Sequence, residues 1–292
     1  MRRPRLRGDP PTRWSAQRDH RRKVAQTTGR LLVVVGPDGS LDLPDAPDTR
    51  RAVRHAWGLA DHPRLVGLPT LLGALSAAEW ARRGLRVPGL HGRLRPAYGV
   101  FSPTRHAYVR LLDELDGIEG TTVLDVGCGT GVLGLVLLQR GASTATGIDT
   151  DPRAVRCATS NARRLGLTKR YQAAEGDLFA GHSADLVVFN PPWIPGQPRT
   201  RLDRAIFDPE GSTLDRWLQQ LRDHLEPRGR GVLLASDLAE RLGLAPPIAQ
   251  RIEAAGLDVV HHAARPPGHQ IDGSDPFAPQ RRAETIGLWV VA

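Results

Sequence analysis

The stretch Val123–Gly131, which reads VLDVGCGTG, joins an apolar run to a glycine-rich turn. The apolar run is typical of a buried β-strand, and the residues that follow, 132–140, have the apolar spacing of a helix. Glycines at such a turn let the backbone bend tightly and approach a nucleotide, because no Cβ stands in the way. The stretch therefore predicts a strand, a turn and a helix that together bind a nucleotide-like ligand.

Strands and helices alternate on both sides of this stretch. The spacing of apolar residues predicts seven strands, at 121–126, 144–149, 171–175, 185–189, 231–235, 258–262 and 284–291. It predicts helices at 104–115, 132–140, 152–165, 213–225 and 247–255. Parallel strands need crossovers of this length, and the two consecutive strands at the end favour an antiparallel last strand. The expected fold class is α/β, with a doubly wound, mostly parallel, seven-stranded Rossmann-like sheet.

Three carboxylates follow strands of this expected sheet. Asp125 lies two positions before the first glycine, Asp149 ends the next strand, and Asp177 follows the third. The carboxyl ends of parallel strands line one crevice, so all three acids can face a single ligand. Three anions suit a cationic ligand that carries an amino acid, a ribose and an adenine but no phosphate, and S-adenosylmethionine has these properties.

A nicotinamide cofactor is the alternative that this turn leaves open. Residues 129–134 also satisfy the pattern GxGxxG, and Asp149 lies at the distance expected for an acid that binds a ribose. A nicotinamide-dependent oxidoreductase is therefore a competing hypothesis.

A second motif ends the strand at 185–189. Residues Asn190–Trp193 read NPPW, and the two prolines remove two backbone donors while fixing the direction of the chain. The Asn190 amide oxygen and the Pro191 carbonyl remain as acceptors for a planar amino group, and Trp193 offers a flat surface for stacking. The motif predicts a site that holds a conjugated NH₂ group.

Together these motifs resemble the class I S-adenosylmethionine-dependent methyltransferases. The likeness is to the amino-methyltransferases with an Asn-Pro-Pro-aromatic tetrapeptide, which include the methyltransferase small domain and release-factor glutamine methyltransferase groups. Residues 99–104 also look like the segment that packs over the cofactor in these enzymes. The candidate cofactor-binding residues are Phe101, Pro103, Asp125, Gly127, Gly129, Gly131, Asp149, Asp177, Leu178 and Asn190, and the candidate catalytic residues are Asn190, Pro191, Pro192 and Trp193.

The resemblance implies methyl transfer from S-adenosylmethionine to a planar nitrogen. The acceptor would be an exocyclic amino group of a base in RNA or DNA, or the side-chain amide of a protein glutamine. A non-catalytic RNA-binding module with the same fold is a further alternative. The leaving group needs no acid, because it departs from the sulfonium as a neutral thioether. Positioning and electrostatics are expected to carry most of the rate, and no dedicated general base is required.

The chain of 292 residues has a net charge of +9, and this charge is unevenly distributed. Residues 1–30 hold ten basic side chains against Asp9 and Asp19, which gives +8 and leaves +1 for the other 262 residues. We interpret 1–30 as a basic disordered tail, either a solvated extension or an arm that contacts nucleic acid.

Three regions follow from these patterns: the tail at 1–30, a small, mainly helical N-terminal subdomain at 31–97, and a methyltransferase domain at 98–292. Within the subdomain, Leu31–Val35 and Leu41–Leu43 are expected to pair as strands across a Pro-Asp-Gly turn. The loop at 196–212 is either a solvated connection or a substrate lid that uses Arg204 and Asp208.

Composition excludes several classes of protein. No apolar run approaches the roughly 18 residues that a membrane span needs. The two cysteines provide neither a disulfide framework nor a metal-ligand spacing, and the N-terminus lacks the pattern of a secretory signal. We therefore expect a cytoplasmic protein with no metal and no membrane partner, and the sequence does not predict its oligomeric state.

Overall fold

The computed structural model describes residues 7–198, 202–268 and 270–292. The chain divides into two compact units, one made of residues up to Gly84 together with Arg95–Gly99, the other of Leu85–Leu94 and Val100–Ala292. Within the described ranges, every helix is too short or too polar to cross a bilayer.

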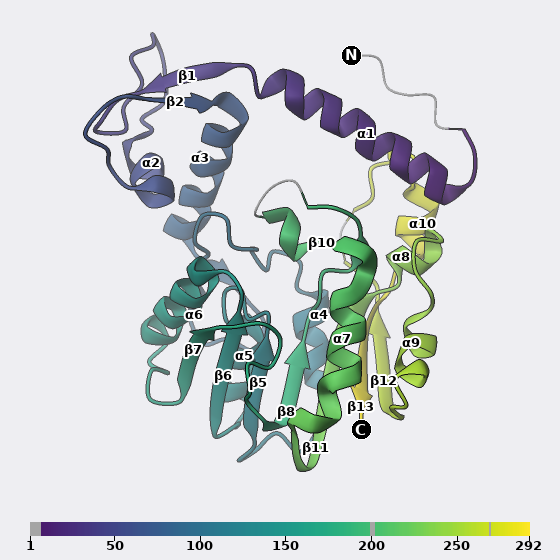
Figure 1. Ribbon diagram of the computed structural model, residues 1–292. Helices are drawn as coiled ribbons and strands as arrows, with labels where there is room; N and C mark the ends of the chain where they lie inside the picture. The colour runs from purple at the N-terminus through teal and green to yellow at the C-terminus, as the bar shows by residue number, and fades with distance from the viewer. Residues whose placement is uncertain (1–6, 199–201, 269) are drawn as a thin grey trace. The chain divides into compact units, whose positions relative to one another are not determined.

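A seven-stranded sheet forms the centre of the second unit (Figure 1). Its spatial order is β12-β13-β11-β8-β5-β6-β7. The strands are β5 (Thr122–Val126), β6 (Thr144–Asp149), β7 (Tyr171–Glu175), β8 (Ala184–Phe189), β11 (Leu225–Ser236), β12 (Val259–Arg265) and β13 (Ile286–Val291). β13 lies between β11 and β12 and pairs with both in the antiparallel direction, while the other pairings in this sheet are parallel. The predicted α/β, mostly parallel, seven-stranded fold is confirmed.

Two hydrophobic layers cover the faces of this sheet. Neighbouring residues of β8 point to opposite faces, so Val188 packs in one layer and Val187 in the other. The first layer is completed by α4 (Ala107–Arg110), η1 (Leu111–Glu114), α5 (Val132–Gln139) and α6 (Pro152–Arg164). The second is completed by α7 (Ser212–Gln220), η4 (Leu221–His224) and α9 (Ile248–Ala254). Burial on both faces explains why the central strands β5 and β8 are mostly apolar.

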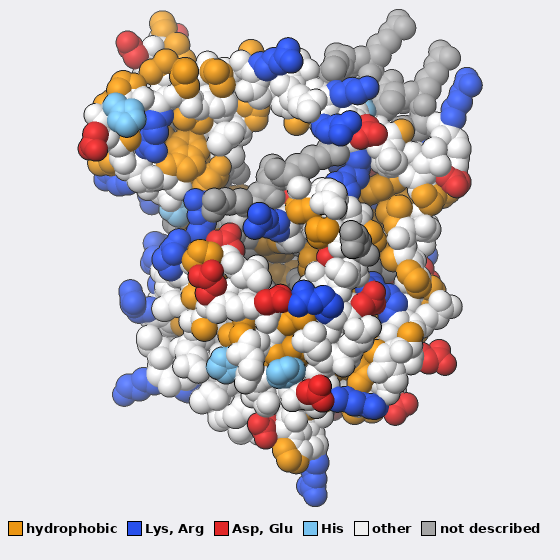
Figure 2. Space-filling view, in the orientation of Figure 1, with side chains coloured by type: hydrophobic (Ala, Val, Ile, Leu, Met, Phe, Trp, Pro, Cys, Tyr) orange, Lys and Arg blue, Asp and Glu red, His pale blue; other side chains and the backbone are white. Residues whose placement is uncertain are grey.

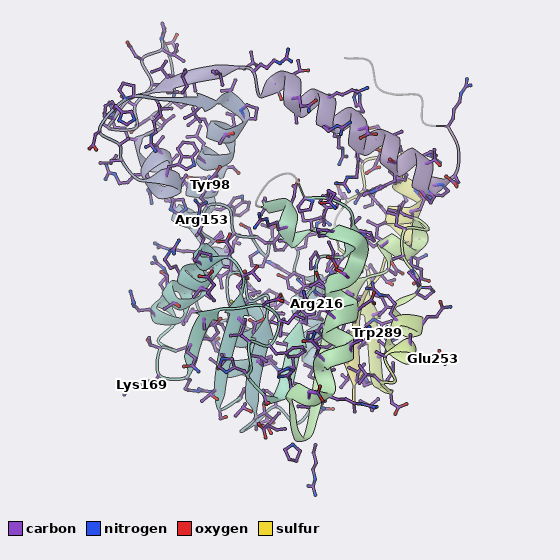
Figure 3. The ribbon with its side chains drawn as sticks, in the orientation of Figure 1. Tyr98, Arg153, Lys169, Arg216, Glu253 and Trp289 are labelled. Atoms are coloured by element: carbon purple, nitrogen blue, oxygen red, sulfur yellow. The ribbon has the colours of Figure 1, made fainter. Side chains whose placement is uncertain are left out.

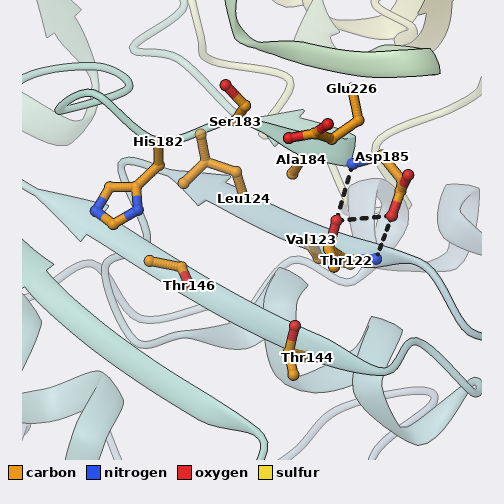
Figure 4. Close-up of a pocket in the computed structure, with 10 residues that line it drawn as sticks. All are labelled: Thr122, Val123, Leu124, Thr144, Thr146, His182, Ser183, Ala184, Asp185 and Glu226. Carbon is orange, nitrogen blue, oxygen red and sulfur yellow. Dashed lines mark hydrogen bonds between the residues drawn. The ribbon is translucent and has the colours of Figure 1, made fainter.

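The amino ends of the strands carry a shallow hollow, at the opposite edge from the glycine turn (Figure 4). In it the Asp185 carboxylate accepts hydrogen bonds from the Thr122 backbone N–H, at 2.8 Å, and from the Thr122 hydroxyl, at 2.7 Å. These bonds fasten β5 to β8 where the two strands begin.

The first unit contains α1 (Pro10–Thr28), β1 (Leu32–Val35), α2 (Arg50–Trp57), β2 (Arg64–Gly67) and α3 (Leu68–Arg83). Val35, Val53 and Leu71 form its small core. The prediction that Leu41–Leu43 pairs with β1 was wrong: β1 pairs with β2, and Leu41 makes only an isolated bridge to Val35. Proline at position 44 has no N–H with which to continue such a pairing.

Helix α1 contradicts the expected disordered tail at 1–30. Residues 1–6 lie outside the described part of the chain, but Pro10–Thr28 is helical. The Asp9 carboxylate accepts a 2.9 Å hydrogen bond from the Thr12 N–H, and Pro10 occupies the first helical position, where no N–H is needed. No glycine or proline interrupts residues 12–28, so the cap and good helix formers outweigh the low hydrophobicity.

A substitution at Gly147 tests how tightly the second unit is packed. A Cβ at Gly147 would stand 2.8 Å from the Cys128 Cβ and would overlap the Tyr171 hydroxyl. We expect Gly147→Ala to lower the free energy of unfolding by about 1 to 3 kcal/mol through overpacking, measured by urea denaturation. Gly73→Ala is the matched control: it lies in α3 with open space around its Cβ position, and it should be neutral or stabilising by up to about 1 kcal/mol. Equal effects of the two changes would contradict the packing described here.

Candidate functional site

The glycine turn lies at the carboxyl end of β5. Gly127, Gly129 and Gly131 all have left-handed φ angles, of 62°, 54° and 80°, which side chains other than glycine rarely adopt. Gly131 also stands at the N-cap position of α5. The N–H of Cys128 donates to the Ile148 carbonyl at 3.0 Å and fastens the turn to β6. The turn therefore exposes backbone without side chains at the sheet edge, as a nucleotide cradle requires.

Asp149 connects this turn to the end of β6. Its carboxylate accepts the Gly129 N–H and the Asp151 N–H, each at 2.9 Å. Burial raises the pKa of Asp149, while these two hydrogen bonds oppose the rise. Each carboxylate oxygen has a second lone pair, so the half-buried side chain keeps acceptor capacity for a ligand.

Asp125 lies beneath the turn rather than on its surface. Its side chain is 1% exposed, and one oxygen accepts the Gly134 N–H at 3.0 Å in the first turns of α5. The other oxygen, Oδ1, is buried without a hydrogen-bond partner among the described residues. Burial raises the pKa of Asp125 to about 7; the bond from Gly134 lowers it and the nearby charge of Asp149 raises it further.

Tyr171 is a component of the site that the sequence analysis missed. The buried ring comes from β7 and lies beneath the turn, where a Cβ on Gly131 would stand 3.0 Å from its hydroxyl and a Cβ on Gly134 would stand 3.1 Å from Cε2. Burial raises the pKa of Tyr171 well above its usual value, so the phenol stays neutral. Positions 134 and 147 lie outside the turn and are both glycine. This was the signal in the sequence from which a large side chain packed against them could have been predicted.

Cys128 is buried inside the same turn. Burial raises the pKa of its thiol well above the usual value, and the charges of Asp125 and Asp149 act in the same direction. A thiol that resists ionisation is a poor nucleophile. Cys128 therefore acts as a small spacer.

The tetrapeptide Asn190–Trp193 follows β8 at the same edge of the sheet. The Trp193 indole N–H is shared between Asn190 Oδ1, at 3.0 Å, and the Leu234 carbonyl of β11, at 3.2 Å. The half-buried indole also packs against the hydrophobic layers on both faces of the sheet. Trp193 thus anchors Asn190 to β11. The sequence predicted only a stacking surface for Trp193 and did not predict this anchoring contact.

The third carboxylate, Asp177, is exposed and forms an ion pair with Arg216 of α7. Arg216 is labelled in Figure 3. Leu178 beside it is buried and has a φ of 50°, unusual for a residue with a branched side chain. Phe101 is half-buried and Pro103 is buried in the segment before α4. The sequence carried no signal for the pairing with Arg216.

The segment after the tetrapeptide is structured on both sides of residues 199–201, which lie outside the described chain. Strands β9 (Ile194–Pro195) and β10 (Phe207–Asp208) pair in parallel. The buried Asp208 carboxylate accepts the Thr213 N–H at 2.7 Å and the Thr213 hydroxyl at 2.8 Å, and so caps the start of α7. Asp208 is therefore an anchor of this segment, whereas Arg204 is exposed.

These features fit a cationic nucleoside ligand. The three carboxylates follow adjacent strands β5, β6 and β7, and they range from buried Asp125 through half-buried Asp149 to exposed Asp177. The turn between them has no side chain at Gly127, Gly129 or Gly131. The half-buried Asp149 carboxylate beside a bare backbone cradle suits S-adenosylmethionine better than a pyrophosphate, which the charge of this carboxylate would repel.

Comparison with known proteins yields one family. The model of the methyltransferase small domain matches residues 92–234. Ribosomal protein L11 methyltransferase of Pectobacterium atrosepticum is 43% identical over 89 residues, which are 30% of this chain and 30% of that protein. A Methanocaldococcus jannaschii protein named as an N5-glutamine methyltransferase is 27% identical over 180 residues, covering 58% of this chain and 89% of that protein. The crystal structure of a ribosomal protein L11 methylase from Lactobacillus delbrueckii covers 70% of this chain and 81% of that chain, at 20% identity and a TM-score of 0.45.

The raised pKa of Asp125 predicts a pH-dependent stability. Its value of about 7 in the folded chain exceeds the roughly 3.9 of an unfolded aspartate, so the folded state binds the proton more tightly. The contribution of this group to stability is therefore complete below pH of about 4 and is lost as the pH rises through about 7. Relative to wild type, Asp125→Asn should gain about 2 to 4 kcal/mol of unfolding free energy between these limits, measured by urea denaturation across pH. Parallel pH profiles of the two proteins would contradict the assignment.

Proposed function

The chain belongs, through residues 92–234, to the methyltransferase small domain family, and on this premise we propose that it is an S-adenosylmethionine-dependent methyltransferase acting on a planar nitrogen. One observation carries the proposal: the glycine turn, flanked by Asp125 and Asp149, shares a sheet edge with Asn190–Trp193. The first set of residues suits the cofactor and the second suits an acceptor N–H group.

The cofactor supplies an electrophilic methyl group on a sulfonium, and the chain supplies position and charge. Gly127 and Gly129 leave room for the methionine portion beside the backbone, whereas the Cβ position of Gly131 faces the buried Tyr171. Asp149, held by the Gly129 N–H, keeps lone pairs for the ribose hydroxyls. Asp177 and Leu178 flank the adenine in this arrangement, with Arg216 holding the Asp177 carboxylate.

Asn190 and Pro191 bind the acceptor nitrogen through their carbonyl oxygens. The Trp193 N–H donates to Asn190 Oδ1, which fixes the amide and occupies one lone pair of this oxygen, so the second lone pair is the one that would accept from the acceptor nitrogen. Partial positive charge grows on the nitrogen as the methyl group transfers, and fixed carbonyl dipoles stabilise that charge without reorganising. The catalytic contribution of these residues is therefore positioning and electrostatics.

The acceptor is a base amino group in RNA or DNA, or a glutamine amide. Both present a planar NH₂ of the kind that Asn190 and Pro191 suit, and the M. jannaschii relative is named for the glutamine reaction. The chain spans about 30% of the length of the ribosomal protein L11 methyltransferases that it matches. Of the alternatives, a nicotinamide-dependent oxidoreductase gives Asn190–Trp193 no role, and a non-catalytic module does not explain why Asn190 is held in this orientation.

Asp149→Ala tests the cofactor site. The loss of charge-assisted hydrogen bonds to ribose hydroxyls should weaken the binding of S-adenosylhomocysteine by about 10- to 100-fold, measured by calorimetry. Asp185→Asn, at the opposite ends of the strands, is the control and should leave the affinity unchanged. If Asp149→Ala binds as tightly as wild type, the cofactor does not contact this carboxylate.

Asn190→Ala tests the acceptor site. Cofactor affinity should stay within a few fold, while transfer of tritiated methyl groups to total RNA and to ribosomal proteins falls by about 100-fold or more. Trp193→Phe keeps an aromatic ring but removes the N–H that orients Asn190, so its loss of activity should be smaller. Activity of Asn190→Ala above about a tenth of wild type would reject the role of this side chain.

A further inference from the structure

Helix α1 is not explained by packing. Of its 19 residues only Trp14 is buried, and its few apolar residues do not gather on one face. A helix that is polar all round does not form to complete a hydrophobic core. Its side chains should therefore have a role at the surface.

The exposed charge of α1 and its flanks is cationic. Residues 7–30 contain seven basic side chains and two acidic ones, and both acids are engaged within the segment. Asp9 caps the helix, and Asp19 lies 3.5 Å from Arg22. Three exposed cations, Arg21, Lys23 and Arg30, form no ion pair with any residue that the structure describes. Lys and Arg side chains are visible on the surface over α1 (Figure 2).

We propose that α1 is a docking surface for the phosphate backbone of RNA. Neutralising phosphates needs exposed Lys and Arg and no apolar face, and α1 has this composition. A helix that binds a membrane surface needs a continuous apolar face, which α1 lacks. A helix that docks on a protein needs exposed apolar or aromatic anchors, and the aromatic residue of α1, Trp14, is buried. The surface lies outside the methyl-transfer site, so the inference stands whether the acceptor is a base or a protein glutamine on an RNA-containing particle.

The spacing of the cations suits a polyanion. Arg21 and Lys23 lie within α1, and Arg30 follows its last residue, Thr28, by two positions. From Arg21 to Thr28 the helix rises about 10 Å, and a backbone that advances about 3.4 Å per phosphate, as in one strand of duplex DNA, places about three phosphates along this span. Residues 31–292 carry 30 basic and 29 acidic side chains, so a non-specific attraction to RNA should come from residues 1–30.

The test compares two triple variants of the full chain that lose the same charge. One replaces Arg21, Lys23 and Arg30 with Gln; the control replaces Arg163, Arg164 and Lys169, which are exposed in the second unit, with Gln. Binding to a labelled single-stranded RNA of about 20 nucleotides is followed by anisotropy at about 50 to 200 mM salt. Circular dichroism verifies that both variants keep their helices, and the single change Lys23→Glu serves as a second probe of the same surface.

We expect the α1 variant to bind RNA at least about tenfold more weakly, with a slope of log affinity against log salt that is shallower by about 2. The control should stay within twofold of wild type. Equal losses in both variants, salt-insensitive binding, or binding to vesicles of anionic lipid in preference to RNA would overturn the proposal. Calorimetry with S-adenosylhomocysteine on the same variants separates the proposed methyltransferase function from the proposed RNA docking. A failure to bind this ligand would reject the methyltransferase function, whereas the RNA docking is judged from the anisotropy measurements alone.

Discussion

The hydrogen bond from the Gly129 N–H to Asp149 joins the glycine turn after β5 to the end of β6. These two elements form the edge of the sheet that would bind the cofactor, called the cofactor edge below. The backbone must leave β5, turn through three left-handed glycines and enter α5, and Asp149 holds the middle of that turn from the end of the neighbouring strand. Tyr171 supports the turn from below, and it fits only because Gly134 and Gly147 have no side chains. One small region therefore requires glycine for two different reasons, positive φ in the turn and close packing around it.

Hydrogen bonds also hold Asn190–Trp193, the segment that would bind the acceptor, to a neighbouring strand. Trp193 bonds to both Asn190 and Leu234, so the tetrapeptide after β8 cannot move independently of β11. Further along the chain, Asp208 caps α7, and Arg216 of α7 pairs with Asp177 beside the cofactor edge. Elements that would bind the acceptor are thus connected to elements that would bind the cofactor through a few polar contacts. Such an arrangement suits a reaction whose rate depends on alignment.

Much of this architecture was predictable because its determinants are local. The strand-turn-helix at Val123–Gln139 follows from apolar periodicity and glycine, and the crossovers between strands imply a parallel sheet. The contacts of Tyr171, Arg216 and Trp193 were not predictable, since each joins residues that only the fold brings together. Helix α1 was not predicted for a different reason. Asp9 and Pro10 are a recognisable signal for the start of a helix, but the dense positive charge and the lack of an apolar period favoured a disordered segment.

The distribution of charge separates two kinds of interaction in one chain. The cofactor edge places three carboxylates on adjacent strands, which favours a cation and repels a phosphate backbone at close range. A polyanion that approached this edge unaided would meet repulsion, so an RNA-bound substrate needs attraction from elsewhere in the molecule. Residues 1–30 hold +8 of the net charge of +9, and the part of them that the structure describes is a capped helix with exposed Arg21 and Lys23, followed by exposed Arg30. Cations on and after α1, away in sequence from Asp125, Asp149 and Asp177, would let one chain attract phosphates and still bind a sulfonium at a site with carboxylates.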